Sequence, residues 1–146
     1  MTTLGALLAI VALLTITVAA GFTLRRWRSA VQRVDTAEII EPARLGAERL
    51  GDRATLLQFS TELCTRCPGV HRTLASIADA KQGVLHLDVD LTHRPDIARH
   101  FRLLQTPTTL ILDRDGAIQA RLGGAPPRDV VELELDRVTR MEHAGA

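Results

Sequence analysis

A long apolar run opens the chain: residues 4–24 read LGALLAIVALLTITVAAGFTL, and no charged side chain occurs before Arg25. This run has about the length that an α-helix needs to cross the hydrocarbon core of a bilayer. It is followed directly by Arg25, Arg26, Trp27 and Arg28. Such an order is typical of a membrane interface, where tryptophan lies among the headgroups and arginine side chains extend toward them. The pattern predicts an N-terminal transmembrane helix in residues 1–24.

Two other structures for this segment compete with an uncleaved anchor. A cleaved signal peptide has a positively charged start and a small-residue cleavage site. Val18-Ala19-Ala20 fits such a site, but residues 1–3 carry no Lys or Arg. A buried core helix normally has a polar face, and this run shows none. We expect the anchor, and because the arginines lie on its C-terminal side, the positive-inside rule predicts a single-pass protein of the cell membrane with a cytoplasmic domain.

The pattern changes after the apolar run. Residues 25–41 mix charged and scattered apolar side chains, which predicts a juxtamembrane linker. From residue 42 onward, apolar positions recur at helical and strand spacing. The expected elements are helices over 43–50, 64–81, 95–104 and 129–141 and strands over 54–59, 84–91, 108–112 and 117–122. The soluble domain is therefore expected to span residues 42–146.

Three patterns support these elements. Val70, Leu74 and Ile77 lie at helical spacing and would form one buried stripe. Residues 84–91 alternate apolar and polar side chains, as a strand with one buried face does. Asp115-Gly116 between two apolar runs is a strong hairpin signal. A strand–helix–strand unit implies a parallel pair, and the hairpin adds antiparallel strands. The expected fold class is α/β, a mixed central sheet flanked by helices.

Composition narrows the classes of function. The chain has 18 Lys and Arg and 17 Asp and Glu, so no basic excess favours binding to nucleic acid. Lys81 is the only lysine, and this bias toward arginine is a weak indication of a bacterial protein. The two cysteines, Cys64 and Cys67, lie three residues apart, which makes any cysteine chemistry local.

The cysteine pair lies where a strand and its loop meet an expected helix, in the segment Cys64-Thr65-Arg66-Cys67-Pro68. Two cysteines at this spacing close a small disulfide ring within one helical turn. Unpaired N–H groups and the dipole at the helix start favour the thiolate of Cys64, as does the charge of Arg66. Because the thiolate is the attacking species in disulfide exchange, the placement predicts a redox-active pair.

A zinc half-site and an inert buried pair are the alternatives. Histidines available as further ligands are His71, His86, His93 and His100. A structural zinc site usually has a recognisable second pair of ligands, and no second CxxC exists in the sequence. Covalent haem attachment needs a histidine directly after the second cysteine, where Pro68 stands. We therefore expect no metal site.

Three features together resemble the thioredoxin family, and more closely its bacterial membrane-tethered members, over about residues 43–141. They are the strand before the cysteines (LLQFSTELCTRC), the strand LHLDVD that ends in an acid, and the loop Gln105-Thr106-Pro107-Thr108. The last of these matches the family's cis-proline loop. The resemblance implies the thioredoxin fold.

The resemblance also implies roles for individual residues. Cys64 matches the exposed nucleophile and Cys67 the resolving cysteine, so that the two form the redox disulfide. Pro107 matches the cis-proline beside the cysteines, which together with Thr106 helps to dock substrate. Gly123 matches a glycine after the last strand.

The sequence departs from the family pattern at several positions. Leu63 replaces a tryptophan, Thr65-Arg66 replaces Gly-Pro between the cysteines, and Gln58 replaces a buried aspartate that helps to move protons. His86 stands where the family has a nearby lysine. These changes affect redox potential and partner choice rather than the exchange chemistry, because both cysteines remain.

The sequence therefore predicts an enzyme, a thiol–disulfide oxidoreductase that reduces disulfides in partner proteins at the membrane. No cofactor is expected, and since no GxGxxG dinucleotide motif is present, electrons must come from an upstream donor protein. One alternative is an extracytoplasmic thiol oxidant or cytochrome-maturation reductase, which needs the opposite membrane orientation. Another is a non-enzymatic thioredoxin-fold binding module or a metal or redox sensor.

Overall fold

The computed structural model describes residues 3–27, 31–33 and 38–144. The chain divides into two compact units, one ending at Ala30 and one beginning at Val31. The first contains a single helix, α1 (Thr3–Trp27). Its large apolar side chains between Leu7 and Phe22 are exposed. No helix in the described ranges has both the length and the apolar character that a membrane crossing requires, so the predicted transmembrane helix is not confirmed.

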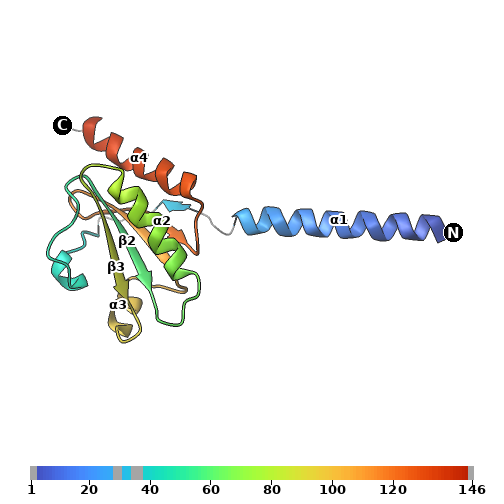
Figure 1. Cartoon of the computed structure of the whole chain (residues 1–146), viewed down its shortest axis with the longest axis horizontal. Helices are drawn as coiled ribbons and strands as arrows, with labels where there is room; N and C mark the ends of the chain where they lie inside the picture. The colour runs from blue at the N-terminus through green and yellow to red at the C-terminus, as the bar shows by residue number, and fades with distance from the viewer. Residues whose placement is uncertain (1–2, 28–30, 34–37, 145–146) are drawn as a thin grey trace. The chain divides into compact units, whose positions relative to one another are not determined.

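The second unit is a five-stranded mixed sheet in the order β1-β5-β4-β2-β3, shown in Figure 1. Its elements are β1 (Val31–Arg33), η1 (Pro42–Leu45), β2 (Ala54–Ser60), α2 (Cys67–Asp79), β3 (Val84–Asp90), α3 (Pro95–His100), β4 (Thr108–Asp113), β5 (Ile118–Gly123) and α4 (Arg128–Ala144). Strands β2 and β3 are parallel, while β2–β4, β4–β5 and β1–β5 are antiparallel. The predicted parallel pair and hairpin are therefore confirmed.

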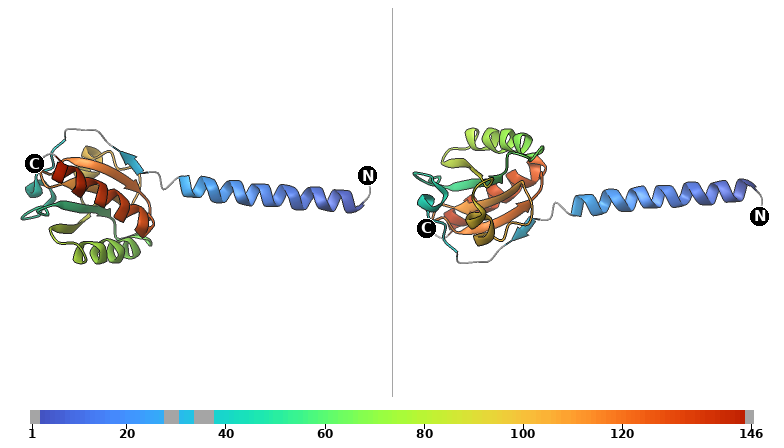
Figure 2. Two further views of the ribbon diagram at one scale, coloured as in Figure 1. Left: turned by 90° about the horizontal axis from the view of Figure 1, so that it is seen from above. Right: turned by 90° about the horizontal axis from the view of Figure 1, so that it is seen from below.

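Helices cover both faces of this sheet, as the sequence pattern predicts. Adjacent side chains of β2 point to opposite faces: Leu56 packs with the apolar sides of α2 and α4, and Leu57 packs with α3 and η1. Leu74 of α2 and Leu135 of α4 are completely buried in the first of these clusters. In the left view of Figure 2, α4 (red) lies across the strands and α2 (green) lies along one side of them. The core is almost entirely aliphatic.

Part of the segment predicted as a linker, residues 25–41, has regular structure: residues 25–27 belong to α1, and residues 31–33 form β1. Strand β1 pairs with β5 at one sheet edge, with Val31 opposite Leu122. Ile40 is only 3% exposed and belongs to the core, and Ile39 forms an isolated bridge with Ala117. A three-residue edge strand is too short to show an alternating pattern, which is why the sequence did not indicate it. Residues 28–30 and 34–37 of this segment lie outside the described residues.

Three predicted helix boundaries are wrong. The expected helix over 43–50 is the short 3₁₀ turn η1, which ends at Gly46 with φ 74°. Helix α2 begins at Cys67 rather than Cys64, with a proline in its first turn, where proline is favoured. Helix α3 ends at His100, because Arg102 has φ 48° and turns the chain toward the loop that contains Pro107. The second correction leaves Cys64 in the loop that precedes α2.

Candidate active site: a cysteine pair at the end of a buried strand

The two cysteines form a disulfide between the end of β2 and the start of α2, with a Cα–Cα distance of 5.4 Å. Backbone N–H groups shape the turn: Cys64 N donates to the carbonyl of Thr61, and Cys67 N donates to the carbonyl of Cys64. Cys67 is 5% exposed, whereas Cys64 is partly exposed. The more accessible cysteine is therefore the first of the pair, and it precedes the helix by three residues.

The loop between α3 and β4 lies beside this turn. Its Thr106–Pro107 peptide bond is cis, as expected from the sequence match. The hydroxyl oxygens of Thr61 and Thr106 lie 3.3 Å apart, and Pro107 O accepts a hydrogen bond from Gly124 N at 2.8 Å. The structure thus places the Thr106-Pro107 loop against the turn that precedes Cys64, although Thr61 and Thr106 are 45 positions apart in the sequence.

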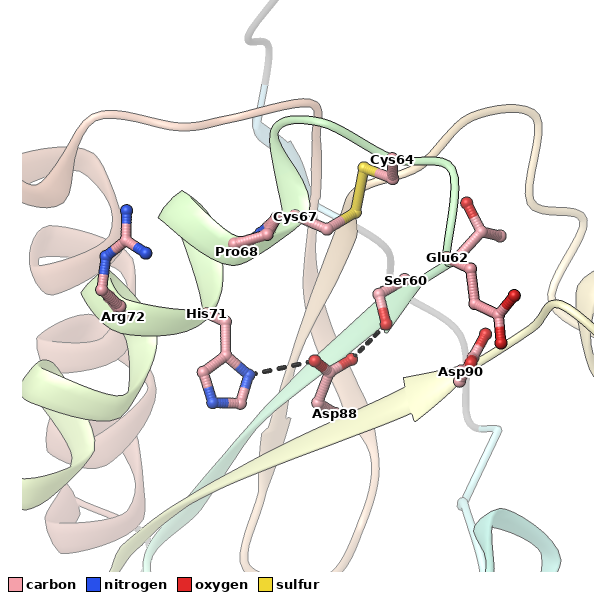
Figure 3. A pocket seen from close by; sticks show the side chains of 10 residues that line it. Ser60, Glu62, Cys64, Cys67, Pro68, His71, Arg72, Asp88 and Asp90 are labelled. Atoms are coloured by element: carbon pink, nitrogen blue, oxygen red, sulfur yellow. Dashed lines mark hydrogen bonds and ion pairs between the residues drawn. A yellow bond between two sulfur atoms is a disulfide. The ribbon is translucent and has the colours of Figure 1, made fainter.

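A hollow of about 400 Å³ lies on the other side of the disulfide, between the start of α2 and the end of β3. Figure 3 shows how its polar side chains are arranged. His71 Nδ1 lies 3.0 Å from Asp88 Oδ2, and Ser60 Oγ donates to Asp88 Oδ1 at 2.6 Å. Asp88 therefore links α2 to the ends of β2 and β3 directly below the cysteine turn.

A second polar contact holds the cysteine turn to the segment after β3. Thr92 Oγ1 accepts a hydrogen bond from Glu62 N at 3.1 Å. The backbone N and the hydroxyl of Thr92 both contact Asp90 Oδ1. These two hydrogen bonds lower the pKa of the Asp90 carboxyl. The sequence did not indicate Thr92 or Asp88 as site residues, since Thr92 is an ordinary polar residue after a strand and Asp88 is one of the alternating polar residues of β3.

Gln58 is completely buried beneath the disulfide. Its Nε2 donates to the carbonyl oxygen of Cys67 at 3.1 Å, and its Oε1 lies 3.2 Å from His86 Nε2. Burial lowers the pKa of His86, as does the neighbouring His71, while Asp88 and Asp79 act in the opposite direction. The position matched in the family by an acid therefore carries an amide that has hydrogen-bond partners at both ends.

Within residues 3–27, 31–33 and 38–144, no three His, Cys, Asp or Glu side chains gather closely enough to hold a metal ion. The chemistry that the residues themselves support is thiol–disulfide exchange at Cys64 and Cys67.

The fold of this chain is found among known protein structures. The fold is similar to mitochondrial thioredoxin 3 from Saccharomyces cerevisiae in its oxidized form, at 21% identity and a TM-score of 0.52 over 59% of this chain and 79% of that one. It is also similar to thioredoxin-2, a component of the malaria parasite protein secretion machinery, at 19% identity and a TM-score of 0.54 over 58% and 82% of the two chains. A designed protein matches at 17% identity and a TM-score of 0.54 over 73% and 96%. None of the curated protein sequences matches this chain at a significant level.

A sequence model of the thioredoxin family matches residues 47–137, which is more than half of the 146-residue chain. The chain therefore belongs to the thioredoxin family. A thioredoxin domain with a closely spaced cysteine pair is the arrangement of a thiol–disulfide oxidoreductase.

Proposed function

We propose that this protein reduces disulfide bonds in partner proteins, with Cys64 as the attacking residue and Cys67 as the resolving residue. The observation that carries the proposal is the difference in exposure within one disulfide: Cys64 is partly exposed, and Cys67 is 5% exposed. A partner sulfur reaches the first cysteine more easily than the second. The neighbouring Thr106-Pro107 loop supplies the surface on which the partner's backbone docks.

The exchange proceeds in two balanced steps. The thiolate of reduced Cys64 attacks one sulfur of the partner disulfide, forming a mixed disulfide, and the other partner sulfur leaves as a thiolate that takes up a proton. The Cys67 thiol then loses its proton and attacks the Cys64 sulfur. The Cys64–Cys67 disulfide forms, and the second partner sulfur leaves and is protonated. The partner gains two electrons, and an upstream dithiol protein must return two electrons to the pair.

The local structure supports attack by the first cysteine. Helix α2 starts at Cys67, and the N–H groups of a first helical turn have no partner within the helix. These groups and the exposed Arg66 favour negative charge on a nearby sulfur. A lowered thiol pKa increases the fraction of thiolate at neutral pH, which is the reactive form.

Turnover of a model disulfide tests this proposal. Wild-type protein should accelerate the reduction of insulin by dithiothreitol, followed by the precipitation of the released insulin chains. Cys64→Ser should reduce the rate to that of dithiothreitol alone, because no attacking thiolate remains. A wild-type rate equal to the dithiothreitol background would exclude the reductase, and stoichiometric zinc in the purified protein would favour the sensor alternative.

We further propose that residues 4–24 attach the domain to the cell membrane, with the cysteines in the cytoplasm. The apolar sequence, the exposed apolar side chains of α1 and the arginines that follow support this proposal. A reducing cytoplasm keeps such a pair mostly as a dithiol, which suits a reductase. A C-terminal fusion to a phosphatase that is active only outside the cytoplasm should stay silent. A strong phosphatase signal would favour the extracytoplasmic oxidant or cytochrome-maturation alternative.

A further inference from the structure

Two hydrogen bonds connect strand β3 to the backbone of the buried cysteine through the side chain of Gln58. The first runs from Gln58 Nε2 to the carbonyl oxygen of Cys67, and the second joins Gln58 Oε1 to His86 Nε2. Gln58 is completely buried, so no water competes for its amide. These hydrogen bonds connect the backbone of Cys67, the first residue of α2, to side chains of β2 and β3.

The direction of these hydrogen bonds is fixed by elementary chemistry. A carbonyl oxygen only accepts, so the Gln58 atom that faces Cys67 must be the NH₂ group. The amide oxygen then faces His86, and Nε2 of the imidazole must carry a proton to donate to it. Both the Nε2–H neutral ring and the imidazolium meet this requirement. His86 therefore keeps its bond to Gln58 in either protonation state, and only its Nδ1 gains or loses a proton.

Groups from three elements surround His86 and act on the protonation of its ring. From α2, the ring of His71 contacts the His86 ring edge-on with centroids 4.7 Å apart, and Asp79 also acts on it. From β3, Asp88 acts on it, and Asp88 Oδ2 lies 3.0 Å from His71 Nδ1. From β2, the neutral Gln58 is its hydrogen-bond partner. Protonation of His86 would place a charge at the far end of a buried chain of donors that ends at Cys67.

We propose that His86 is a positioning residue for the resolving cysteine, acting through Gln58 on the backbone of Cys67 and making the reactivity of the Cys67 thiol depend on the protonation of the imidazole. A charged donor forms a stronger hydrogen bond than a neutral one, and bonds aligned in one direction polarise one another. The protonated ring thus strengthens the hold on Cys67 and favours its thiolate. This role rests on the proposed function, because it concerns the second step of the same exchange.

The second step is measured directly with Ellman's reagent. Cys64 of the reduced protein releases one thionitrobenzoate and retains the other as a mixed disulfide. Attack by Cys67 then releases the second thionitrobenzoate and closes the Cys64–Cys67 disulfide. Stopped-flow absorbance from pH 5 to 9 separates the two releases. The wild-type second step should show two ionisations, one from the Cys67 thiol and one from His86.

Two substitutions separate the hydrogen bond from the charge. His86→Gln places an amide NH₂ near the position of Nε2, so it keeps the donor but does not titrate. His86→Leu keeps neither. The second release should slow roughly three- to tenfold in His86→Leu, the size expected for one lost hydrogen bond, and His86→Gln should recover the rate at pH 8 but show a single ionisation. His100→Gln serves as the control. It removes a histidine of α3 that contacts Glu38, and it should behave as wild type.

The outcomes distinguish this role from the proposed function. If His86→Leu matches the wild type in rate and pH profile, or if His86→Gln retains both ionisations, His86 does not act on Cys67. The test with His86→Gln stands even if His86→Leu fails to fold. The first release reports Cys64 alone and should be unchanged in all His86 variants. If wild type shows no first release above that of Cys64→Ser, the proposed function itself fails.

Discussion

The hydroxyl oxygens of Thr61 and Thr106 lie 3.3 Å apart and join the turn before Cys64 to the loop that ends in the cis peptide of Pro107. The two residues are 45 positions apart in the sequence. Their contact holds the turn before Cys64 against the loop that contains Pro107.

Replacing Thr106 with valine should loosen this contact while conserving side-chain size. We expect the free energy of unfolding to fall by about 0.5–1.5 kcal/mol, the usual net worth of one hydrogen bond, and insulin reduction to slow. Urea denaturation and the insulin assay measure the two effects. Because Thr61 and Thr106 share one bond, adding Thr61→Val should cause little further loss. Additive losses in the double variant would show that the two hydroxyls act independently.

Two glycines should respond in opposite ways to substitution by alanine. A Cβ at Gly51 would lie 2.1 Å from the carbonyl oxygen of Ala54 and 2.8 Å from the backbone nitrogen of Leu85. Neither atom moves without disturbing the sheet, so Gly51→Ala should lower the free energy of unfolding by about 2–3 kcal/mol. A Cβ at Gly69, inside α2, meets nothing within 4 Å. Gly69→Ala should therefore raise stability by up to about 1 kcal/mol.

Urea denaturation of the two glycine variants compares them under the same conditions. If Gly51→Ala were as stable as wild type, the close approach of the segment before β2 to the backbone of β3 would be contradicted.

The sequence predicted the parts of the fold that repeat a pattern. Leu74 and Ile77 at helical spacing, and the Asp115-Gly116 turn, were enough to predict α2 and the hairpin of β4 and β5. The starting residue of α2 was predicted three positions too early, because CxxC spacing suits a helix as well as a turn. Strand β1 has only three residues, too few to show an alternation of apolar and polar side chains.

The cysteines of the site could be recognised locally, but their surroundings could not. Thr106 and Pro107 were expected from a family motif, and the structure shows the cis bond and the contact of Thr106 with Thr61 in the turn before Cys64. The bonds from Gln58 to Cys67 and His86 join residues that no sequence period relates. The sequence showed only that an amide stands where an acid is usual, and the structure shows which atoms that amide binds.

Acid should destabilise the protein partly through His86. The pKa of His86 is lowered by burial and by His71, whereas the unfolded chain has the ordinary value of about 6.5. Between these two pKa values the unfolded state binds more protons than the folded state. The free energy of unfolding therefore has its full value above about pH 6.5 and falls as the pH drops toward the lowered pKa. Urea denaturation between pH 5 and 8 should show a smaller fall for His86→Gln. An identical fall in both proteins would contradict the shift.

The two thiols of the reduced protein should differ in reactivity. Iodoacetamide at pH 7 should modify Cys64 faster than Cys67, because Cys64 is more exposed and lies beside Arg66. Trypsin cleavage after Arg66 places the two cysteines on separate peptides, so mass spectrometry measures each rate independently. In urea the two should react at similar rates. Faster modification of Cys67 in the folded protein would reverse the assigned roles.

Trapping of the mixed disulfide tests the central claim most directly. Reduced Cys67→Ser protein mixed with insulin should form a covalent adduct on a non-reducing gel, linked through Cys64 and released by dithiothreitol, because the resolving thiol is absent. Wild-type protein should release reduced insulin without accumulating the adduct, and Cys64→Ser should form little adduct. An adduct that accumulates with Cys64→Ser but not with Cys67→Ser would contradict the assignment of Cys64 as the attacking residue.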